Sequence, residues 1–491
     1  MNQDHVRPPR PHSQTPSRQA LDRRRFLRLS AAALAAAPAA GGALRAAWLD
    51  DAVRPGFQQI DSLADFERAL ASRGNKIRLK PGVYRIDHAQ ADNKTLFHVT
   101  GSNNHFDLRG VTLQLDTRVL AAMRGKVHQL AGYRITGSNL IFEGGVFEDL
   151  GQEPPYESLS DFDVGGNDIT FRDCTFTVRG SAPYGYGDLF GKGAGALVRL
   201  QKHAAMSVRG NNTQILGCRF FMHTFGHAIH MHGAQNTLVQ DVCVEGTLRN
   251  SDEILAETTG HAARLQYKDH YGRPIRPNTM ICLNEDAIRA YLDGGRDKPH
   301  PRTADITVIN CTVKRMRGGV TLALASGKID VRGCTVTECG YPGHAYSLPT
   351  GARVRDCRGD ATYAPLLHMG YSHQHDADIE LTLLAAQRHV GNNLVALLNG
   401  SRHKVTIAPP RDAPSAARAK PSSDPTSALQ IVCGQTYRGD QADVGKTSAR
   451  EIELVNHTRA AVLLSALSSG CKVRSAGPVQ NEGKDNTVVQ V

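Results

Sequence analysis

The clearest pattern in this chain is a short segment of alternating apolar and polar residues that returns many times. One copy runs Asp168-Ile-Thr-Phe-Arg-Asp-Cys174, and later copies run Asp305-Ile-Thr-Val-Ile-Asn-Cys311 and Lys328-Ile-Asp-Val-Arg-Gly-Cys334. A period of two residues is typical of a strand with one face on the core. Gly, Asn and Asp separate the copies, so we expect short strands bounded by tight turns.

The cysteines measure the length of the repeat. The step from Cys218 to Cys243 is 25, and the steps from Cys311 to Cys334 and from Cys334 to Cys357 are both 23; the step from Cys174 to Cys218 is 44, close to two periods. These six cysteines therefore occupy one position of the repeat. They are expected to form an internal stack of free thiols, although a rung spacing of about 4.8 Å would also allow a disulfide.

Repeats of this length cannot close a core alone, so they must stack. The pattern lacks the leucines of leucine-rich repeats and is too short for propeller blades of about 40 residues. Three short strands and three turns per coil fit it, which predicts an all-β, right-handed parallel β-helix. From Pro81-Gly-Val-Tyr84 through the Asn/Asp-Cys rungs to about residue 480, the chain resembles the pectate-lyase-like β-helix superfamily.

The N-terminal segment 1–47 reads as an export signal. Asp22-Arg-Arg-Arg-Phe-Leu-Arg28 is followed by an alanine-rich apolar stretch, and a cleavage site would fall after Ala40 or Ala47. The consecutive arginines resemble the twin-arginine export motif, which implies a periplasmic or secreted protein that folds before export. Residues 48–491 are then one β-helix domain, with an insertion at about 247–284 and a flexible loop at 409–427.

Charge changes this picture little. The chain of 491 residues has a formal charge of +11, but residues 1–47 hold eight Lys/Arg and two Asp/Glu, so the remainder carries 50 against 45. That balance suits an acidic ligand and is not a nucleic-acid footprint. Beyond the N-terminal signal no apolar stretch is long enough for a membrane span.

Aligning the repeats locates one polar face. Counting back fourteen residues from Cys243 and Cys334 places Ile229 and Val320 on one inward row, and the match in pattern between residues 286–291 and 227–232 adds Ile288 to it. By strand alternation four neighbours must then point outward and stack on adjacent rungs: His230, His232, Arg289 and Tyr291. The coil before supplies only Ala205 and Ser207, so we expect a groove with these four residues as catalytic candidates.

Several other polar residues are candidates beside this groove. Arg317, Lys268 and Tyr271 would bind substrate, and the 247–284 insertion would wall the groove. The carboxylates are alternative acid/base groups or metal ligands: Asp252, Glu257, Glu285 and Asp286. A second interpretation has the two histidines solvated or holding a metal, and the carboxylates would suit a Ca²⁺ ion.

An exported β-helix with a polar groove points first to a polysaccharide or oligosaccharide substrate. β-Elimination from a uronate needs a cation for the carboxylate, supplied by Arg289 or Arg317, a base, His230 or His232, and an acid, Tyr291. Hydrolysis or transglycosylation needs two carboxylates instead. A non-catalytic glycan-binding or adhesin-type β-helix is the third interpretation.

Overall fold

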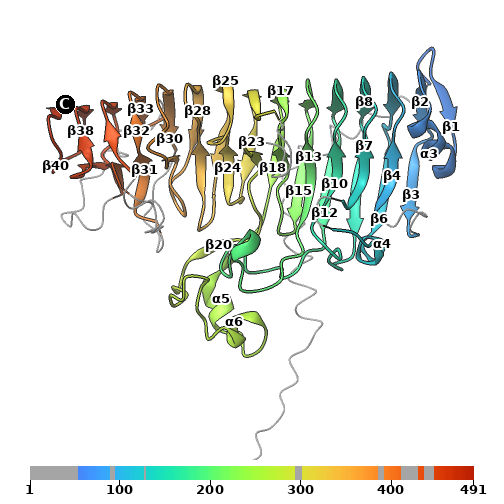
Figure 1. The fold of residues 1–491 in the computed structure, drawn as a ribbon, viewed down its shortest axis with the longest axis horizontal. Helices are drawn as coiled ribbons and strands as arrows, with labels where there is room; N and C mark the ends of the chain where they lie inside the picture. The colour runs from blue at the N-terminus through green and yellow to red at the C-terminus, as the bar shows by residue number, and fades with distance from the viewer. Residues whose placement is uncertain are drawn as a thin grey trace, which may run out of the picture. The chain divides into compact units, whose positions relative to one another are not determined.

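The computed structural model describes residues 53–88, 94–126, 129–292, 301–384, 392–410, 429–435 and 447–491. The export signal at 1–47 lies outside the described residues, as does nearly all of the loop expected at 409–427. Within the described residues the chain is almost entirely parallel β-structure, and successive coils lie side by side along one axis (Figure 1). The right-handed parallel β-helix is confirmed.

One sheet carries the functional face and contains 13 of the described strands, which lie on successive coils. Its strands are β4 (Thr95–Val99), β7 (Ala131–Ile135), β10 (Leu159–Val164), β13 (His203–Val208), β16 (Ile229–Met231), β21 (Ile288–Ala290), β24 (Gly318–Thr321), β27 (His344–Ser347), β29 (Leu367–Met369), β31 (Leu394–Leu398), β34 (Gln430–Cys433), β37 (Ala461–Leu464) and β40 (Val479–Asn481). We call it the front sheet.

The second large sheet, which has 23 strands, wraps around the rest of each coil in two columns. The first column is β1 (Gln58–Ile60), β2 (Lys76–Leu79), β5 (Asn104–Asp107), β8 (Leu140–Glu143), β11 (Ile169–Arg172), β14 (Gln214–Leu216), β17 (Gln235–Gln240), β22 (Ala304–Ile309), β25 (Ser326–Arg332), β28 (Arg353–Gly359), β30 (Asp378–Leu383), β33 (Lys404–Ala408), β36 (Glu453–Asn456), β39 (Lys472–Ser475) and β41 (Thr487–Gln490). The second is β3 (Gly82–Ile86), β6 (Val111–Asp116), β9 (Val146–Leu150), β12 (Thr175–Arg179), β15 (Arg219–His223), β18 (Cys243–Glu245), β23 (Thr312–Lys314) and β26 (Thr335–Thr337).

The remaining elements are short. Helix α3 (Leu63–Ala71) covers the first coil, where Phe66 packs edge-on against Phe106 with ring centroids 5.6 Å apart. Helix α4 (Thr117–Ala122) follows β6, and a turn of 3₁₀ helix, η1, spans Gly193–Gly195. Strands β19 (Leu248–Asn250) and β20 (Met280–Cys282) pair antiparallel and bracket α5 (Ser251–Leu255) and α6 (His261–Arg264). Strands β32 (Gly400–Ser401), β35 (Ala449–Arg450) and β38 (Ser468–Ser469) form a small third parallel sheet. Of the helices in the described ranges, none has the length and apolar character needed to cross a membrane.

Five of the six ladder cysteines lie in the core, as the repeat predicts. Cys311, Cys334 and Cys357 stack in successive coils, and the Cys334 N–H donates to the Cys357 sulfur at 3.4 Å. All ten cysteines are free thiols. Cys243 is the exception, because it pairs in register with Arg219 and Thr312 on the outward parity. Val242 takes the core position in this coil, and a shift of one residue reverses the face that a side chain takes.

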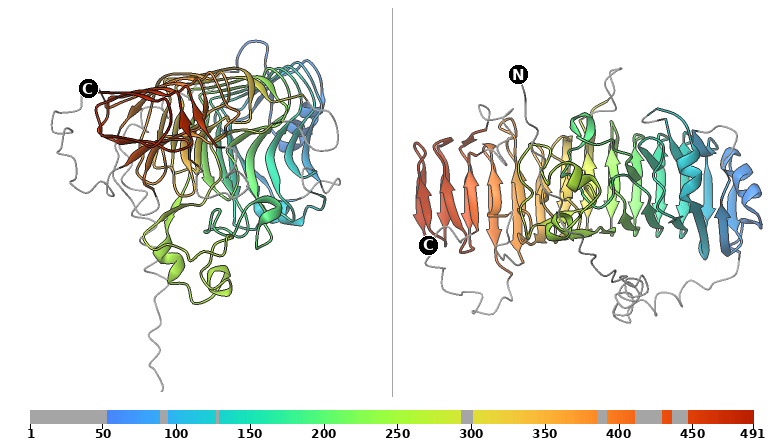
Figure 2. Two further views of the ribbon diagram at one scale, coloured as in Figure 1. Left: turned by 60° about the vertical axis from the view of Figure 1, so that its left-hand side comes forward. Right: turned by 90° about the horizontal axis from the view of Figure 1, so that it is seen from below.

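The step of 44 from Cys174 to Cys218 is one coil, not two. Strand β12 pairs directly with β15, Thr175 opposite Arg219, so no coil lies between them. The extra residues, 180–202, leave the coil and join the predicted insertion at 247–284 in a side lobe, which projects from the solenoid in Figure 1 and in the left view of Figure 2. A fixed repeat cannot distinguish an inserted loop from a missing cysteine, which is why the sequence suggested two coils.

Candidate functional site

A cavity of about 700 Å³ opens on the front sheet at strands β10, β13, β16 and β21. Apolar lining residues come from Leu130, Leu159 and the segment 193–202, which we call the wall segment. The lining also holds most of the reactive groups of this face: Asp163, Lys202, Arg209, His227, His230, His232, Glu285 and Tyr291. A concave site with one apolar wall and a few convergent polar groups is the usual form of a small-ligand site.

The wall owes its position to the side lobe. Tyr186, Leu189 and Phe190 from the 180–202 excursion pack against residues of the 247–284 insertion in a second small hydrophobic core, which also holds Ile254, Ala262, Ile275 and Ile281. The insertion was expected to wall the groove itself. The residues that line the cavity come instead from 193–202, and the insertion supports that segment from behind.

The predicted register of the polar face is confirmed. Ile229 pairs with Ile288, and Ile288 with Val320; His230 pairs with Arg289, and Arg289 with Thr321. The adjacent row brings the rings of His232 and Tyr291 into a stack, with centroids 4.4 Å apart and planes 8° apart. All four catalytic candidates are half-buried rather than open to solvent, because the side lobe and the wall segment shelter this part of the sheet.

His230 has no hydrogen-bond partner among the described residues. Its Nδ1 is buried and unpaired, so Nε2 is the nitrogen that a ligand in the cavity can reach. Burial, together with the neighbouring His227 and His232, holds the pKa of His230 well below its usual value. The ring is therefore neutral at neutral pH and can act as a base. A buried polar atom left unpaired is rare in folded proteins, and a catalytic role is one explanation for it.

His227 is a site residue that the sequence reasoning did not select. The Asp286 N–H donates to its Nδ1 at 3.1 Å, a shorter contact than the 3.4 Å from Nδ1 to the Asp286 carbonyl oxygen, which favours the tautomer with the proton on Nε2. That nitrogen lies 2.8 Å from the Tyr291 hydroxyl and 3.3 Å from Glu285. Burial lowers the pKa of His227 to about 4, so the ring stays neutral.

The tautomer of His227 decides the direction of the hydrogen bond to Tyr291. Because Nε2 carries the proton, it donates to the Tyr291 oxygen, and the phenolic proton is left to point elsewhere. Tyr291 lines the cavity, and burial raises its pKa. It is thus a protonated phenol whose own hydrogen is available to a ligand.

Lys202 and Glu285 form a second pair in the cavity. Lys202 Nζ donates to Glu285 Oε1 at 2.6 Å, and the ammonium lies 4.9 Å from the Phe225 ring centroid. Burial alone would raise the pKa of Glu285, but the surrounding His227, Lys202 and Arg317 hold it well below its usual range. Glu285 is therefore an ionised partner for cations and not a proton donor.

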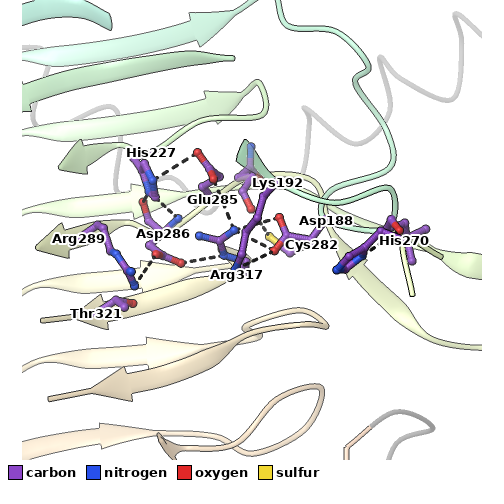
Figure 3. A network of polar contacts seen from close by, with 12 residues as sticks. Asp188, Lys192, His227, His270, Cys282, Glu285, Asp286, Arg289, Arg317 and Thr321 are labelled. Carbon is purple, nitrogen blue, oxygen red and sulfur yellow. Dashed lines mark hydrogen bonds and ion pairs between the residues drawn. The ribbon is translucent and has the colours of Figure 1, made fainter. Parts of the chain in front are cut away.

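Arg317, predicted to bind substrate, is instead buried at the centre of an ion cluster. Its Nη1 donates to both carboxylate oxygens of Asp188 at 2.9 Å, and its Nε donates to Asp286 Oδ1 at 3.0 Å; Glu285 lies 3.5 Å away (Figure 3). Asp188 belongs to the 180–202 excursion, so this cluster fastens the cavity wall to the front sheet. The guanidinium is saturated by carboxylates and is not among the groups that line the cavity.

Arg289 and Asp286 lie at the edge of the same cluster. Arg289 Nη1 is 3.4 Å from Asp286 Oδ2, and its guanidinium carbon is 5.0 Å from the Tyr291 ring centroid. Neither residue belongs to the cavity lining. Burial alone would raise the pKa of Asp286, but Arg317 and Arg289 hold it well below its usual range, so this carboxylate balances cations.

The candidates on the 247–284 insertion lie away from the cavity. Lys268 is exposed beside Pro274, and Tyr271 is half exposed under the guanidinium of Arg273. Asp252 accepts a hydrogen bond from the Asn278 N–H at 2.6 Å, and Glu257 accepts one from the Tyr186 hydroxyl at 2.7 Å. These four residues hold the side lobe together or face solvent, and the structure does not bring them to the His230 group.

One group of the described residues has the spacing of a metal site, and it lies apart from His230. Asp149, Asp161 and His203 place three ligating atoms within 4.8 Å of one another. Both His203 nitrogens face acceptors: Nδ1 is 2.5 Å from the Arg179 carbonyl oxygen and Nε2 is 2.7 Å from Asp161 Oδ1. A neutral ring has only one N–H, so a ring that donates to both acceptors must be a charged imidazolium. Both nitrogens of His203 are then occupied by protons and neither is available to bind a metal.

The chain finds no match among family models or curated proteins. Solved structures do match: a PL6 alginate lyase in complex with a trisaccharide (12% identity, TM-score 0.40, 89% of this chain and 85% of that one). A second is the alginate lyase AlyF-OU02 with G6, at 12% identity and a TM-score of 0.42, which covers 88% of this chain and 89% of that one. A third is a mutant tailspike protein of E. coli bacteriophage HK620 with a pentasaccharide, at 10% identity and a TM-score of 0.45, which covers 87% of this chain and 73% of that one. The strand pairings of this chain establish its fold.

Proposed function

We propose that this chain is an exported carbohydrate-active enzyme that cleaves a uronate-containing glycan by β-elimination. The observation that carries the proposal is that two groups meet in one cavity. One is a neutral His230 without a hydrogen-bond partner, and the other is a protonated Tyr291 that accepts a hydrogen bond from His227 and can therefore donate its own hydrogen to a ligand. Both rings line the cavity, with centroids 6.3 Å apart, so one sugar unit lying above them can meet both groups.

In the proposed reaction His230 Nε2 removes the proton from C5 of the uronate. The electron pair of that bond forms the C4–C5 double bond, the bond from C4 to the glycosidic oxygen breaks, and Tyr291 donates its proton to the leaving oxygen. The imidazolium and phenolate that remain exchange protons with solvent before the next turnover. His227 acts as a positioning residue, because it holds the Tyr291 hydroxyl in the donating orientation.

The carboxylates of the cavity favour elimination over hydrolysis. A glycoside hydrolase needs one carboxylic acid with a raised pKa. Of the two carboxylates in the lining, Glu285 has a lowered pKa and lies against Lys202, and Asp163 lies between Arg134 and Arg209. Asp252 and Glu257, the other candidates for a pair, lie in the side lobe.

The proposal is tested by incubating the protein with a panel of uronate polymers and following the ultraviolet absorbance of the unsaturated product. His230→Ala and Tyr291→Phe should each lose about 10²–10⁴ in rate and keep the thermal stability of the parent protein. Lys268→Ala, in the side lobe, is the matched control and should keep full activity. New reducing ends without absorbance would indicate a hydrolase, and binding without any product a non-catalytic glycan-binding protein; either result overturns the proposal.

A further inference from the structure

We propose that Arg209 is the centre of a carboxylate-binding subsite that holds a uronate group of the glycan beside His230. The inference rests on the proposed function and names what the cavity recognises in its substrate. Neither Arg289 nor Arg317, the cations expected from the sequence, lines the cavity, so a different group must meet the negative charge of an acidic sugar.

Arg209 directly follows β13 and continues the row of Tyr291. The His232 N–H donates to the Val208 carbonyl at 2.9 Å, which places Arg209 and His232 on adjacent rungs. Arg209, His232 and Tyr291 therefore follow one another along the solenoid at intervals of about 4.8 Å. The parallel row of Ser207, His230 and Arg289 lies next to it. Arg209 thus stands one rung before His232 and within the same cavity.

The guanidinium of Arg209 is only partly used by the protein. Its Nε lies 2.9 Å from Asp163 Oδ1, and its two Nη atoms have no partner among the described residues. Asp163 is also bound by Arg134, from the preceding rung. One carboxylate therefore serves two guanidinium groups, and the pair holds Arg209 in place without neutralising it. Its side chain is 33% exposed, so a ligand can reach it.

The charge of the cavity favours an anion. The lining contains the cations Arg199, Lys202 and Arg209 and the anions Asp163 and Glu285. Each anion has a further cation behind it, Arg134 or Arg317, that does not reach the cavity. Arg199 is paired with Glu157 and Lys202 with Glu285, so the surplus positive charge lies at Arg209, which shares Asp163 with Arg134.

A planar carboxylate matches the free edge of a guanidinium through two parallel hydrogen bonds. Arg209 also lies close enough to His230 to act on its ionisation, since its charge is among those that lower the His230 pKa. A carboxylate on Arg209 would thus be held beside the nitrogen that removes the C5 proton. This position fits the acidic group of the reacting uronate or of the unit next to it in the chain.

The test compares an oligouronate with its carboxyl-reduced, neutral counterpart in binding to the full chain by calorimetry. Arg209→Gln should weaken binding of the oligouronate about 10- to 100-fold, as expected when hydrogen bonds to a charged group are lost, and leave the neutral oligomer unchanged. Arg209→Lys should restore only part of the affinity, because an ammonium cannot form the paired contact. Arg332→Gln is the control: this surface arginine lies against Asp330 and is not part of the cavity lining, so its loss should change binding less than threefold.

The outcomes separate this inference from the proposed function. Arg209-dependent binding of the oligouronate without an unsaturated product would reject the lyase and keep the subsite. Formation of the product with unchanged preference for the acidic oligomer in Arg209→Gln would overturn the subsite and keep the lyase. A sulfated derivative of the carboxyl-reduced oligomer that binds as tightly as the oligouronate would also overturn it, because the site would then recognise negative charge in general and not a carboxylate. Thermal unfolding of each variant at the parent temperature shows that it is folded.

Discussion

Raising the pH should lower the free energy of unfolding of this protein through one buried histidine, His203. His203 begins strand β13, has no exposed surface and directly follows the wall segment, while Arg179, which its Nδ1 contacts, directly precedes the 180–202 excursion. Asp161 accepts the hydrogen bond of Nε2 at 2.7 Å. The imidazolium therefore ties both ends of the excursion to each other and to the front sheet.

The magnitude follows from the ionisation of that ring. Burial alone would lower the pKa of His203, but the carboxylates of Asp161 and Asp149 raise it to about 9. In the unfolded chain a histidine titrates at about 6.5, and each pH unit of difference is worth about 1.4 kcal/mol. The folded state therefore gains about 3 kcal/mol, fully present below pH 6.5 and lost as the pH rises through about 9.

The assay is urea or thermal unfolding from pH 6 to 10 at constant ionic strength. The control is the double variant His203→Gln/Asp161→Asn, which replaces the ion pair by a neutral pair of similar shape. Lysines, tyrosines and thiols titrate in both proteins, whereas Asp149, whose pKa burial and Asp161 raise, is coupled to the pair, so the difference between the two unfolding midpoints reports the His203 cluster as a whole. We expect the parent protein to lose stability relative to the variant between pH 7 and 10. Parallel curves over that range would refute the reasoning.

The other predictions concern the ion cluster, the base and the export signal. Arg317→Leu removes the cation that three buried carboxylates share and leaves two of them with only a more distant cation, which should cost about 3–5 kcal/mol of stability, seen as a fall in unfolding temperature, whereas Arg332→Leu on the surface should change little. Because the His230 pKa is lowered and the base must be neutral, activity should persist below pH 6 and decline only as the pH falls through that pKa; an acid limb at pH 6.5 or above would contradict this. Changing Arg23 and Arg24 to lysine should keep the protein in the cytoplasm, measured by fractionation, and unchanged export would remove the twin-arginine assignment.

The sequence alone determined the solenoid and the register of its front sheet. Strand parity is a local property: once Ile229 and Ile288 must face the core, His230 and Arg289 must face outward, whatever the rest of the chain does. The same periodicity predicted the stacked thiols of Cys334 and Cys357. It failed at Cys243, where the strand register and not the spacing of the cysteines decides which face a residue takes.

The tertiary structure decided which outward residues form one site. Segment 180–202 leaves its coil and packs on the distant insertion at 247–284, and hydrophobic contacts between two insertions have no period that a sequence can display. Those contacts bring Lys202 and Asp188 over the sheet, bury Arg317 among carboxylates and enclose the cavity at Arg209. The protonation states of His203 and His227 depend on which acceptors and donors the fold places against each ring nitrogen, and only the assembled coils fix those partners.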